Sequence, residues 1–216
     1  MSRVHVWWQK TSVVPAWGTV AEQWLTAEES DRFDGFRVRR DAERFLGGTL
    51  LLKGALSVIT GRDPSRTSLS RRCECGQEHG RPRDVDGTVH LSLSHSEGLM
   101  VVAASLVAPL GVDVERVPSR CPVELFNSVV ARGDVSPTTA GEFAQLWCRK
   151  EAWLKATGEG LRTAMNQVAI SPGNNVLDMQ TPEYGYRAAI ATLQGTPKIT
   201  VGDVDELLRR FWLPQG

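Results

Sequence analysis

The stretch LWCRKEAWLKATG, residues 146–158, predicts a helix that ends at Gly158, because glycine tolerates the left-handed conformation that closes a helix. At 3.6 residues per turn, one stripe of this helix carries the apolar side chains Phe143, Trp147 and Leu154. Glu151 lies at the edge of that stripe, with Lys155 one turn further on. The sequence thus predicts a carboxylate pressed against apolar neighbours. Taken alone, the pattern also fits a surface helix in which Glu151 and Lys155 form an ordinary ion pair.

A second acidic element lies upstream, in the alternating stretch Gly111-Val112-Asp113-Val114-Glu115. Alternation predicts a strand that buries the two valines and carries Asp113 and Glu115 side by side, about 7 Å apart, on its other face. Two carboxylates at this spacing can bind one hard cation such as Mg²⁺, whose coordination is usually completed by water and substrate phosphates. Alone, the pattern equally describes a strand with a solvated acidic face.

Together the two elements resemble the signature of the 4′-phosphopantetheinyl transferases, of the larger, monomeric type that serves peptide and polyketide synthases. That family has a Gly-Val/Ile-Asp-x-Glu strand, followed some tens of residues later by Trp-x-x-Lys-Glu-Ala/Ser-x-x-Lys on a helix. Both are present here, at residues 111–115 and 147–155, and the resemblance runs from about Arg37 to Gly160. It implies an α+β fold of two similar α/β halves related by a pseudo-two-fold axis. We place the coenzyme A-binding half at residues 1–108, and the metal site and catalytic helix at 109–216.

Composition excludes several other classes of protein. With 216 residues, 41% of them hydrophobic and 23% charged, the chain is an ordinary globular protein. Its 25 basic and 25 acidic residues cancel, so no overall field attracts nucleic acid or an anionic membrane. We expect no signal peptide and no membrane span, and four cysteines without a secretion signal favour reduced thiols in the cytoplasm. Two halves in one chain make a monomer the expected state.

Hydrophobic periodicity predicts a succession of strands and helices. A strand begins at Val4, and Pro15 and Gly18 interrupt the chain after it. Two helices are expected next, from about Ala21 to Phe33 and from about Val38 to Thr60, and then a strand hairpin around residues 89–106. Beyond Gly160, short alternating runs predict an antiparallel meander followed by a terminal helix, at residues 167–170, 175–179, 184–192, 198–201 and 205–212.

Arginines at the start of the second helix offer bidentate donors for a phosphate. Arg37, Arg40 and Arg44 follow one another at i, i+3 and i+7, but nearby acids make a solvated, paired surface an equal alternative. The resemblance implies that Arg44 contacts the 3′-phosphate of coenzyme A, with Arg32, Arg37, Arg39 and Arg40 as supporting candidates. It also places Arg81, in Gly80-Arg81-Pro82 where relatives have Gly-Lys-Pro, near the adenine nucleotide.

The hairpin carries a hydroxyl and an imidazole at a strand end, Ser94 and His95, where both can donate to an anion. The segment resembles the family's Asn-x-Ser-His-Ser motif, which implies that His95 and Ser94 contact a phosphate of the coenzyme. Ser92 stands where the family usually has asparagine, at a position expected to support the turn.

The loop before the hairpin contains a different candidate site, formed by Cys73, Cys75 and His79. Three such side chains can bind zinc, but the cysteines are only two residues apart and no fourth ligand is evident. A loop with free thiols is the preferred interpretation, and a zinc-stabilised binding module the alternative.

Transfer of phosphopantetheine from coenzyme A to an acyl- or peptidyl-carrier protein is the activity that the resemblance implies. The reaction needs charge neutralisation on both phosphates, an in-line hydroxyl and a base. We assign Mg²⁺ to Asp113, Glu115 and Glu151, and place Asp113 also beside the coenzyme. Glu151 is the leading base, directly or through a metal-bound water, while Lys150 and Lys155 hold phosphate oxygens and stabilise the departing 3′,5′-ADP. A metal-dependent phosphohydrolase would use the same carboxylates, whereas zero net charge disfavours an arginine-rich nucleic-acid binder.

Overall fold

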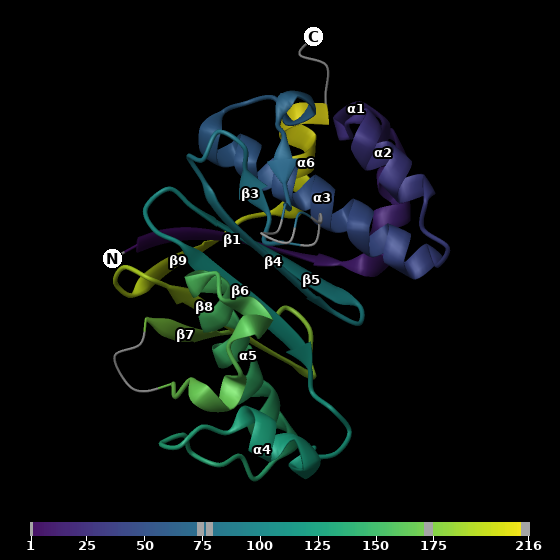
Figure 1. The fold of residues 1–216 in the computed structure, drawn as a ribbon. Coiled ribbons are helices and arrows are strands. Elements are labelled where there is room, and N and C mark those ends of the chain that lie inside the picture. Colours follow the sequence, from purple (N-terminus) through teal and green to yellow (C-terminus); the bar gives the residue numbers. More distant parts are fainter. Residues whose placement is uncertain (1, 73–75, 77–79, 171–174, 213–216) are drawn as a thin grey trace.

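A computed structural model describes residues 2–72, 76, 80–170 and 175–212, and shows two stacked β-sheets between layers of helices (Figure 1). Within these residues one sheet has six strands in the order β2-β3-β4-β5-β1-β9, and the other has three in the order β6-β8-β7. The strands are β1 (Ser2–Lys10), β2 (Leu69–Ser70), β3 (Arg83–Asp84), β4 (His90–Ser96), β5 (Leu99–Ser105), β6 (Leu110–Arg116), β7 (Val176–Met179), β8 (Tyr186–Thr192) and β9 (Pro197–Val201). The helices are α1 (Gly18–Trp24), α2 (Ala27–Asp34), α3 (Arg39–Thr60), α4 (Phe126–Val129), α5 (Ala140–Thr157) and α6 (Val204–Trp212), with short 3-10 turns between them.

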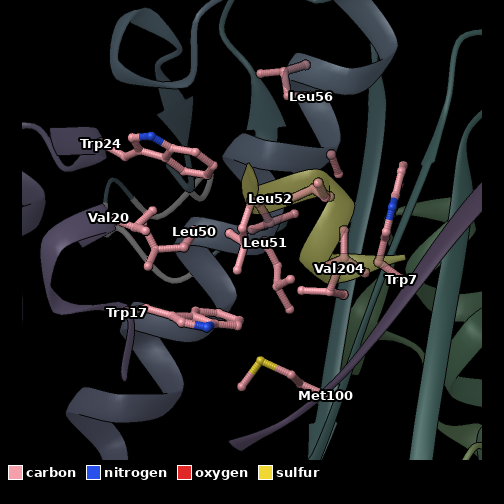
Figure 2. Packing of buried hydrophobic residues seen from close by; sticks show 14 of the residues in the cluster. Trp7, Trp17, Val20, Trp24, Leu50, Leu51, Leu52, Leu56, Met100 and Val204 are labelled. Atoms are coloured by element: carbon pink, nitrogen blue, oxygen red, sulfur yellow. The ribbon is translucent and has the colours of Figure 1, made fainter. Parts of the chain in front are cut away.

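Helix α3 is the centre of the larger hydrophobic core. Its middle turns are buried on nearly all sides, because the six-stranded sheet covers one face and α1, α6 and the 3-10 turn Thr11–Trp17 cover others. Figure 2 shows Leu50, Leu51 and Leu52 of α3 surrounded by side chains of other elements. Trp17, Val20 and Trp24 come from the N-terminal helical segments, Trp7 and Met100 from the sheet, and Val204 from α6. The confirmed prediction of one long helix here therefore identifies the element that organises this half of the core.

The predicted helix from Ala21 to Phe33 is wrong in one respect, because the structure divides it into α1 and α2. Thr26 interrupts it as the N-cap of α2, where its hydroxyl accepts from the Glu29 main-chain N–H while the Glu29 carboxylate accepts from the Thr26 N–H. This capping box satisfies main-chain donors that a continuous helix would bond internally. The buried ammonium of Lys53 then ties the junction to α3, bonding Glu29 at 2.8 Å and the Trp24 carbonyl at 2.7 Å.

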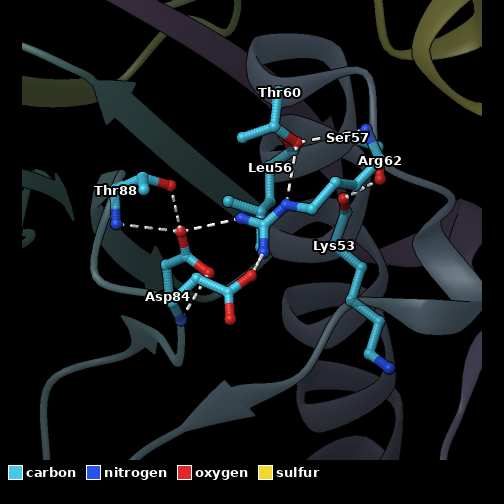
Figure 3. Close-up of polar contacts among 8 residues, drawn as sticks. Lys53, Leu56, Ser57, Thr60, Arg62, Asp84 and Thr88 are labelled. Atoms are coloured by element: carbon cyan, nitrogen blue, oxygen red, sulfur yellow. Dashed lines mark hydrogen bonds and ion pairs between the residues drawn. The ribbon is translucent and has the colours of Figure 1, made fainter.

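A polar cluster fixes the other end of α3 to the larger sheet (Figure 3). Gly61 closes the helix with φ of 77°, and the next residue, Arg62, bonds Asp84 of β3 at 2.8 Å and also pairs with Asp86. Asp84 is buried and accepts in addition from the main chain and hydroxyl of Thr88. The helix is thereby held at a defined position over the sheet.

The smaller sheet packs on the opposite face of the larger one, and α5 covers its outer side (Figure 1). Val4 and Val6 of β1 meet Val112 and Val114 of β6 between the sheets. On the other side α5 lies so close to β6 that a side chain at Gly111 would collide with the Ala152 carbonyl. The glycine of the sequence motif is thus explained by close packing of a strand on a helix.

The C-terminal meander is only partly as predicted. Strands β7 and β8 pair antiparallel as expected, but β9 pairs in parallel with β1 of the larger sheet, and Leu207 of α6 contacts α3 at Gly54. The run 167–170 is not a strand, because its main-chain groups bond side chains: the Val168 carbonyl accepts from Lys150 and the Ile170 N–H donates to Asp134. The division at residue 108 and the pseudo-two-fold axis stay predictions. Among the described helices, none has the length and apolar character needed to cross a bilayer.

Candidate active site

The two sequence motifs meet where α5 lies against β6. Asp113 is only 2% exposed, so the alternative of a solvated acidic strand face is wrong for this residue. The Lys155 ammonium bonds its Oδ1 at 2.6 Å, and the Ser94 hydroxyl donates to the same oxygen at 2.7 Å. Lys155 also donates to Ser94 Oγ at 3.1 Å and to the Val112 carbonyl at 3.2 Å. Residues from β4, β6 and α5 therefore form one buried polar cluster.

The carboxylates of this cluster are only partly neutralised by positive groups of the chain. Asp113 Oδ2 is buried and has no hydrogen-bond partner among the described residues. Burial raises the pKa of Glu115, and the charges of Asp113 and Glu151 raise it further, against a hydrogen bond from Ser96. Burial likewise raises the pKa of Glu151; Lys155 opposes this shift and Asp113 adds to it. The three carboxylates are near enough to repel one another, and an added cation would relieve that repulsion.

The donor set fits a hard divalent cation. Carboxylate oxygens are the ligands that Mg²⁺ prefers, and the unpartnered Asp113 Oδ2 is a free ligand atom. In the part of the chain that the structure describes, no three acidic, histidine or cysteine side chains are arranged to hold a metal ion by themselves. Substrate oxygens and water would have to complete any coordination sphere to which Asp113, Glu115 and Glu151 contribute.

A second positive region lies beside this cluster, around His95 and Arg44. Desolvation lowers the pKa of His95, and the charges of Arg44, Lys155 and Arg71 lower it further, which places these groups close together and keeps the ring neutral near pH 7. Arg44 pairs with Asp41 at 3.0 Å through Nη1, while its Nε is buried without a partner among the described residues. Of the row Arg37, Arg40 and Arg44, Arg44 pairs with Asp41, as the alternative of a paired surface expects, and the neighbouring Arg39 pairs with Glu43.

Arg81 bonds the main chain. Its guanidinium donates to three carbonyls, of Leu91 at 3.3 Å, Leu110 at 2.9 Å and Ala156 at 3.4 Å. These carbonyls belong to β4, β6 and α5, the same three elements that form the acidic cluster. Arg81 therefore joins the elements of the site, and the contact with the nucleotide that the resemblance implies stays a prediction.

Lys150 does not lie with the other predicted site residues. Its ammonium is fully buried and bonds Asp134 at 2.5 Å and the carbonyls of Met165 and Val168 at 2.9 and 2.7 Å. Lys150 and Lys155 are five residues apart on α5 and therefore point about 140° apart around its axis. Only Lys155 faces β6, so the structure does not support a phosphate contact for Lys150.

Sequence reasoning missed Ser96 and Cys148. Ser96 Oγ donates to Glu115 Oε2 at 2.7 Å, and the alternation Ser92-x-Ser94-x-Ser96 was a signal that three hydroxyls share one face. Cys148 is buried near Asp113 and Glu115, and burial, followed by these charges, raises its pKa. The zinc candidates Cys73, Cys75 and His79 lie outside the described residues.

Comparison with known proteins gives a consistent result. Residues 109–191 match the family model of the 4′-phosphopantetheinyl transferase superfamily. A 4′-phosphopantetheinyl transferase of Bacillus subtilis is 28% identical over 153 residues, 68% of this chain and 66% of that protein. The transferase gsp of Aneurinibacillus migulanus is 28% identical over 148 residues, 66% of this chain and 60% of its own length. Sfp of Bacillus subtilis strain 168 is 27% identical over 174 residues, 71% of this chain and 75% of Sfp. The chain thus spans just under two thirds of the length of the first two relatives.

Proposed function

We propose that this chain, which matches the 4′-phosphopantetheinyl transferase superfamily over residues 109–191, transfers the phosphopantetheinyl group of coenzyme A to a serine of an apo acyl- or peptidyl-carrier protein. The observation that carries this proposal is the cluster of Asp113, Lys155 and Ser94 beside two carboxylates of raised pKa. The carboxylates of this cluster can bind a metal cation, and the Lys155 ammonium can bind a phosphate oxygen.

The reaction exchanges a phosphoanhydride bond of coenzyme A for a phosphoester bond on the carrier serine. The serine oxygen of the carrier forms a bond to the phosphorus that bears the pantetheine arm, and the bond from that phosphorus to the bridging pyrophosphate oxygen breaks. The electron pair leaves with 3′,5′-ADP, and the hydroxyl proton passes to a base. Such a reaction depends mainly on positioning and on stabilisation of negative charge.

Positive and hydrogen-bonding groups of the chain are available for the coenzyme. The Lys155 side chain is 26% exposed, and its ammonium bonds Asp113, Ser94 and the Val112 carbonyl. A contact with a pyrophosphate oxygen would replace one of these three bonds. His95, neutral near pH 7, is a donor for a phosphate oxygen, and the unpartnered Nε of Arg44 is a further donor nearby. We assign the 3′-phosphate to Arg44 and His95, and the pyrophosphate to Lys155. The Ser94 hydroxyl would contact the pyrophosphate as well if its proton turned from Asp113 to a phosphate oxygen.

Glu151 is assigned the role of base. A carboxylate whose pKa is raised by burial binds a proton more readily than an exposed one. Mg²⁺, when bound by Asp113, Glu115 and Glu151, would neutralise the pyrophosphate and the charge that develops on the leaving group. A glutamate that binds the metal tightly is a hindered base, so these two roles of Glu151 are alternatives.

Intact-mass analysis tests the proposal. A panel of apo carrier domains is incubated with the protein, coenzyme A and Mg²⁺, with a chelator as control, and a metal-dependent gain of one phosphopantetheinyl group is expected. Glu151→Gln should lower the rate by about 10² to 10⁴, typical for a general base, while coenzyme A still binds. Full activity of this variant would contradict the assignment of the base.

A metal-dependent phosphohydrolase is the second candidate, because the same carboxylates would serve it. The same assay separates the two: a hydrolase releases 3′,5′-ADP or phosphate without any carrier, whereas the transferase does not. We further propose two similar halves, divided near residue 108, in a cytoplasmic monomer; a single mass at the size of one chain in light scattering would support the monomer.

A further inference from the structure

Three serines of β4 face β6, and each bonds a different part of that strand. Ser92 Oγ accepts from the Val112 main-chain N–H at 3.0 Å, and Ser94 Oγ donates to Asp113 Oδ1 at 2.7 Å. Ser96 Oγ donates to Glu115 Oε2 at 2.7 Å and accepts from the Arg116 main-chain N–H at 3.1 Å. We call these residues the serine ladder.

The serine ladder takes the place of main-chain pairing between the two sheets. β4 lies inside the six-stranded sheet, while β6 forms an edge of the three-stranded one. An edge strand has main-chain N–H groups that need partners when they are buried. Ser92 accepts from the buried N–H of Val112, and Ser96 accepts from the N–H of Arg116 at the exposed end of β6, so side chains hold the seam between the sheets.

Ser96 differs from Ser92 in what else it binds. The Ser96 hydroxyl is bonded on one side to the main chain of β6 and on the other to a carboxylate oxygen of the same strand. Because one hydroxyl makes both bonds, the position of Glu115 Oε2 is fixed relative to the strand that also carries Asp113. The charges of Asp113 and Glu151 act on the same carboxyl group and raise its pKa.

We propose that Ser96 is a positioning residue that orients Glu115 for a divalent cation. A carboxylate that must be turned into place on binding loses conformational freedom at that moment, whereas one already held by a hydroxyl does not. Ser92 makes the equivalent bond to β6 but touches no carboxylate, so it serves the structure of the seam alone. The inference rests on one part of the proposed function, the binding of a divalent cation at this site. It is independent of whether the transfer reaction takes place.

The matched variants Ser96→Ala and Ser92→Ala test the proposal, with Mn²⁺ as a paramagnetic probe. Binding is measured by electron paramagnetic resonance of free Mn²⁺, without coenzyme A or carrier protein. Ser96→Ala should weaken Mn²⁺ binding by about tenfold or more, as is typical when a residue that holds a metal ligand is removed. Ser92→Ala should bind Mn²⁺ within about twofold of the wild type, although it also loses a bond between the sheets.

Ser96→Thr keeps the hydroxyl and should bind Mn²⁺ as the wild type does, which separates orientation from a general loss of structure. If Ser96→Ala does not fold, Ser96→Cys, with a weak donor of similar size, replaces it and should show intermediate affinity. Equal effects of the Ser96 and Ser92 variants, or none from Ser96, would overturn the proposal. A wild type that binds Mn²⁺ with the predicted dependence on Ser96 but transfers nothing would refute the proposed function and leave this inference standing.

Discussion

Lys150 offers the sharpest test of what the helix motif does, because the structure turns its side chain away from the acidic cluster. We expect Lys150→Met to destabilise the protein while leaving coenzyme A affinity unchanged. The variant removes a fully buried ammonium that pairs with Asp134 at 2.5 Å and satisfies two carbonyls. Asp134, 1% exposed at its side chain, would then keep its charge in a buried position without a counter-ion.

The expected loss follows from that geometry. Removing one partner of a buried ion pair costs about 4 kcal/mol, because the remaining charge is left uncompensated. For a chain of 216 residues this corresponds to a fall in melting temperature of roughly 8 to 16 °C. The double variant Lys150→Met, Asp134→Asn should lose less than the sum of the two single variants, since no unpaired charge remains.

Urea unfolding and calorimetric titration with coenzyme A measure the two effects separately. Arg44→Met is the matched control, for which we expect little change in stability and a clear loss of coenzyme A affinity. The ion pair of Arg44 with Asp41 is partly exposed and contributes at most about 1 kcal/mol to the free energy of unfolding. Coenzyme A affinity of this variant should fall about tenfold or more. The reasoning would be refuted if Lys150→Met unfolded within about 1 kcal/mol of the wild type and lost coenzyme A affinity as Arg44→Met does.

Further expectations concern the strand, the carboxylates and the thiols. Gly111→Ala should destabilise by about 3 kcal/mol in urea, since its Cβ meets α5 main chain, while Gly18→Ala, with open space around its Cβ, should be nearly neutral. Glu151→Gln should raise the melting temperature at pH 7 without divalent cations. Folding raises the pKa of Glu151, so ionisation of this carboxyl lowers the stability of the wild type as pH rises through the raised pKa. The difference in melting temperature between Glu151→Gln and the wild type should therefore disappear at acidic pH, which melting curves at several pH values would show. Cys148, buried and of raised pKa, should react with iodoacetamide only on unfolding, later than the partly exposed Cys121, as followed by peptide mass mapping.

Local patterns in the sequence predicted the parts of the site that a single element determines. The alternation around Asp113 and the helical stripe through Trp147 and Leu154 identified β6 and α5, and Gly158 ends α5 in the left-handed conformation, with φ of 80°. The prediction that Glu151 is partly desolvated is matched by its raised pKa. Such features depend on neighbours in the chain, which periodicity describes directly.

Features that depend on distant residues were not predicted. Nothing in the helix motif indicates that Lys150 pairs with Asp134, which lies in an irregular segment before α5. Nor does the sequence around β9 indicate that Ile199 would pair with Val4 at the other end of the chain. Such pairings depend on how distant segments pack in the folded chain. Lys150 could therefore be assigned to a phosphate although it pairs with Asp134, while its helix was predicted correctly.

The position of Lys155 shows how the distant elements of the site are held to one another. Its ammonium bonds Asp113 and Ser94, while the carbonyl of the next residue, Ala156, accepts from Arg81. The last turn of α5 is therefore fixed from two sides. The guanidinium of Arg81 also bonds main-chain carbonyls of β4 and β6, so one arginine restrains the same three elements whose side chains form the acidic cluster. Because lysine carries a single ammonium without the planar, forked donors of arginine, it could not make this set of bonds as well. A lysine at position 81, as in the family motif, would therefore leave the end of α5 and the start of β6 less firmly joined.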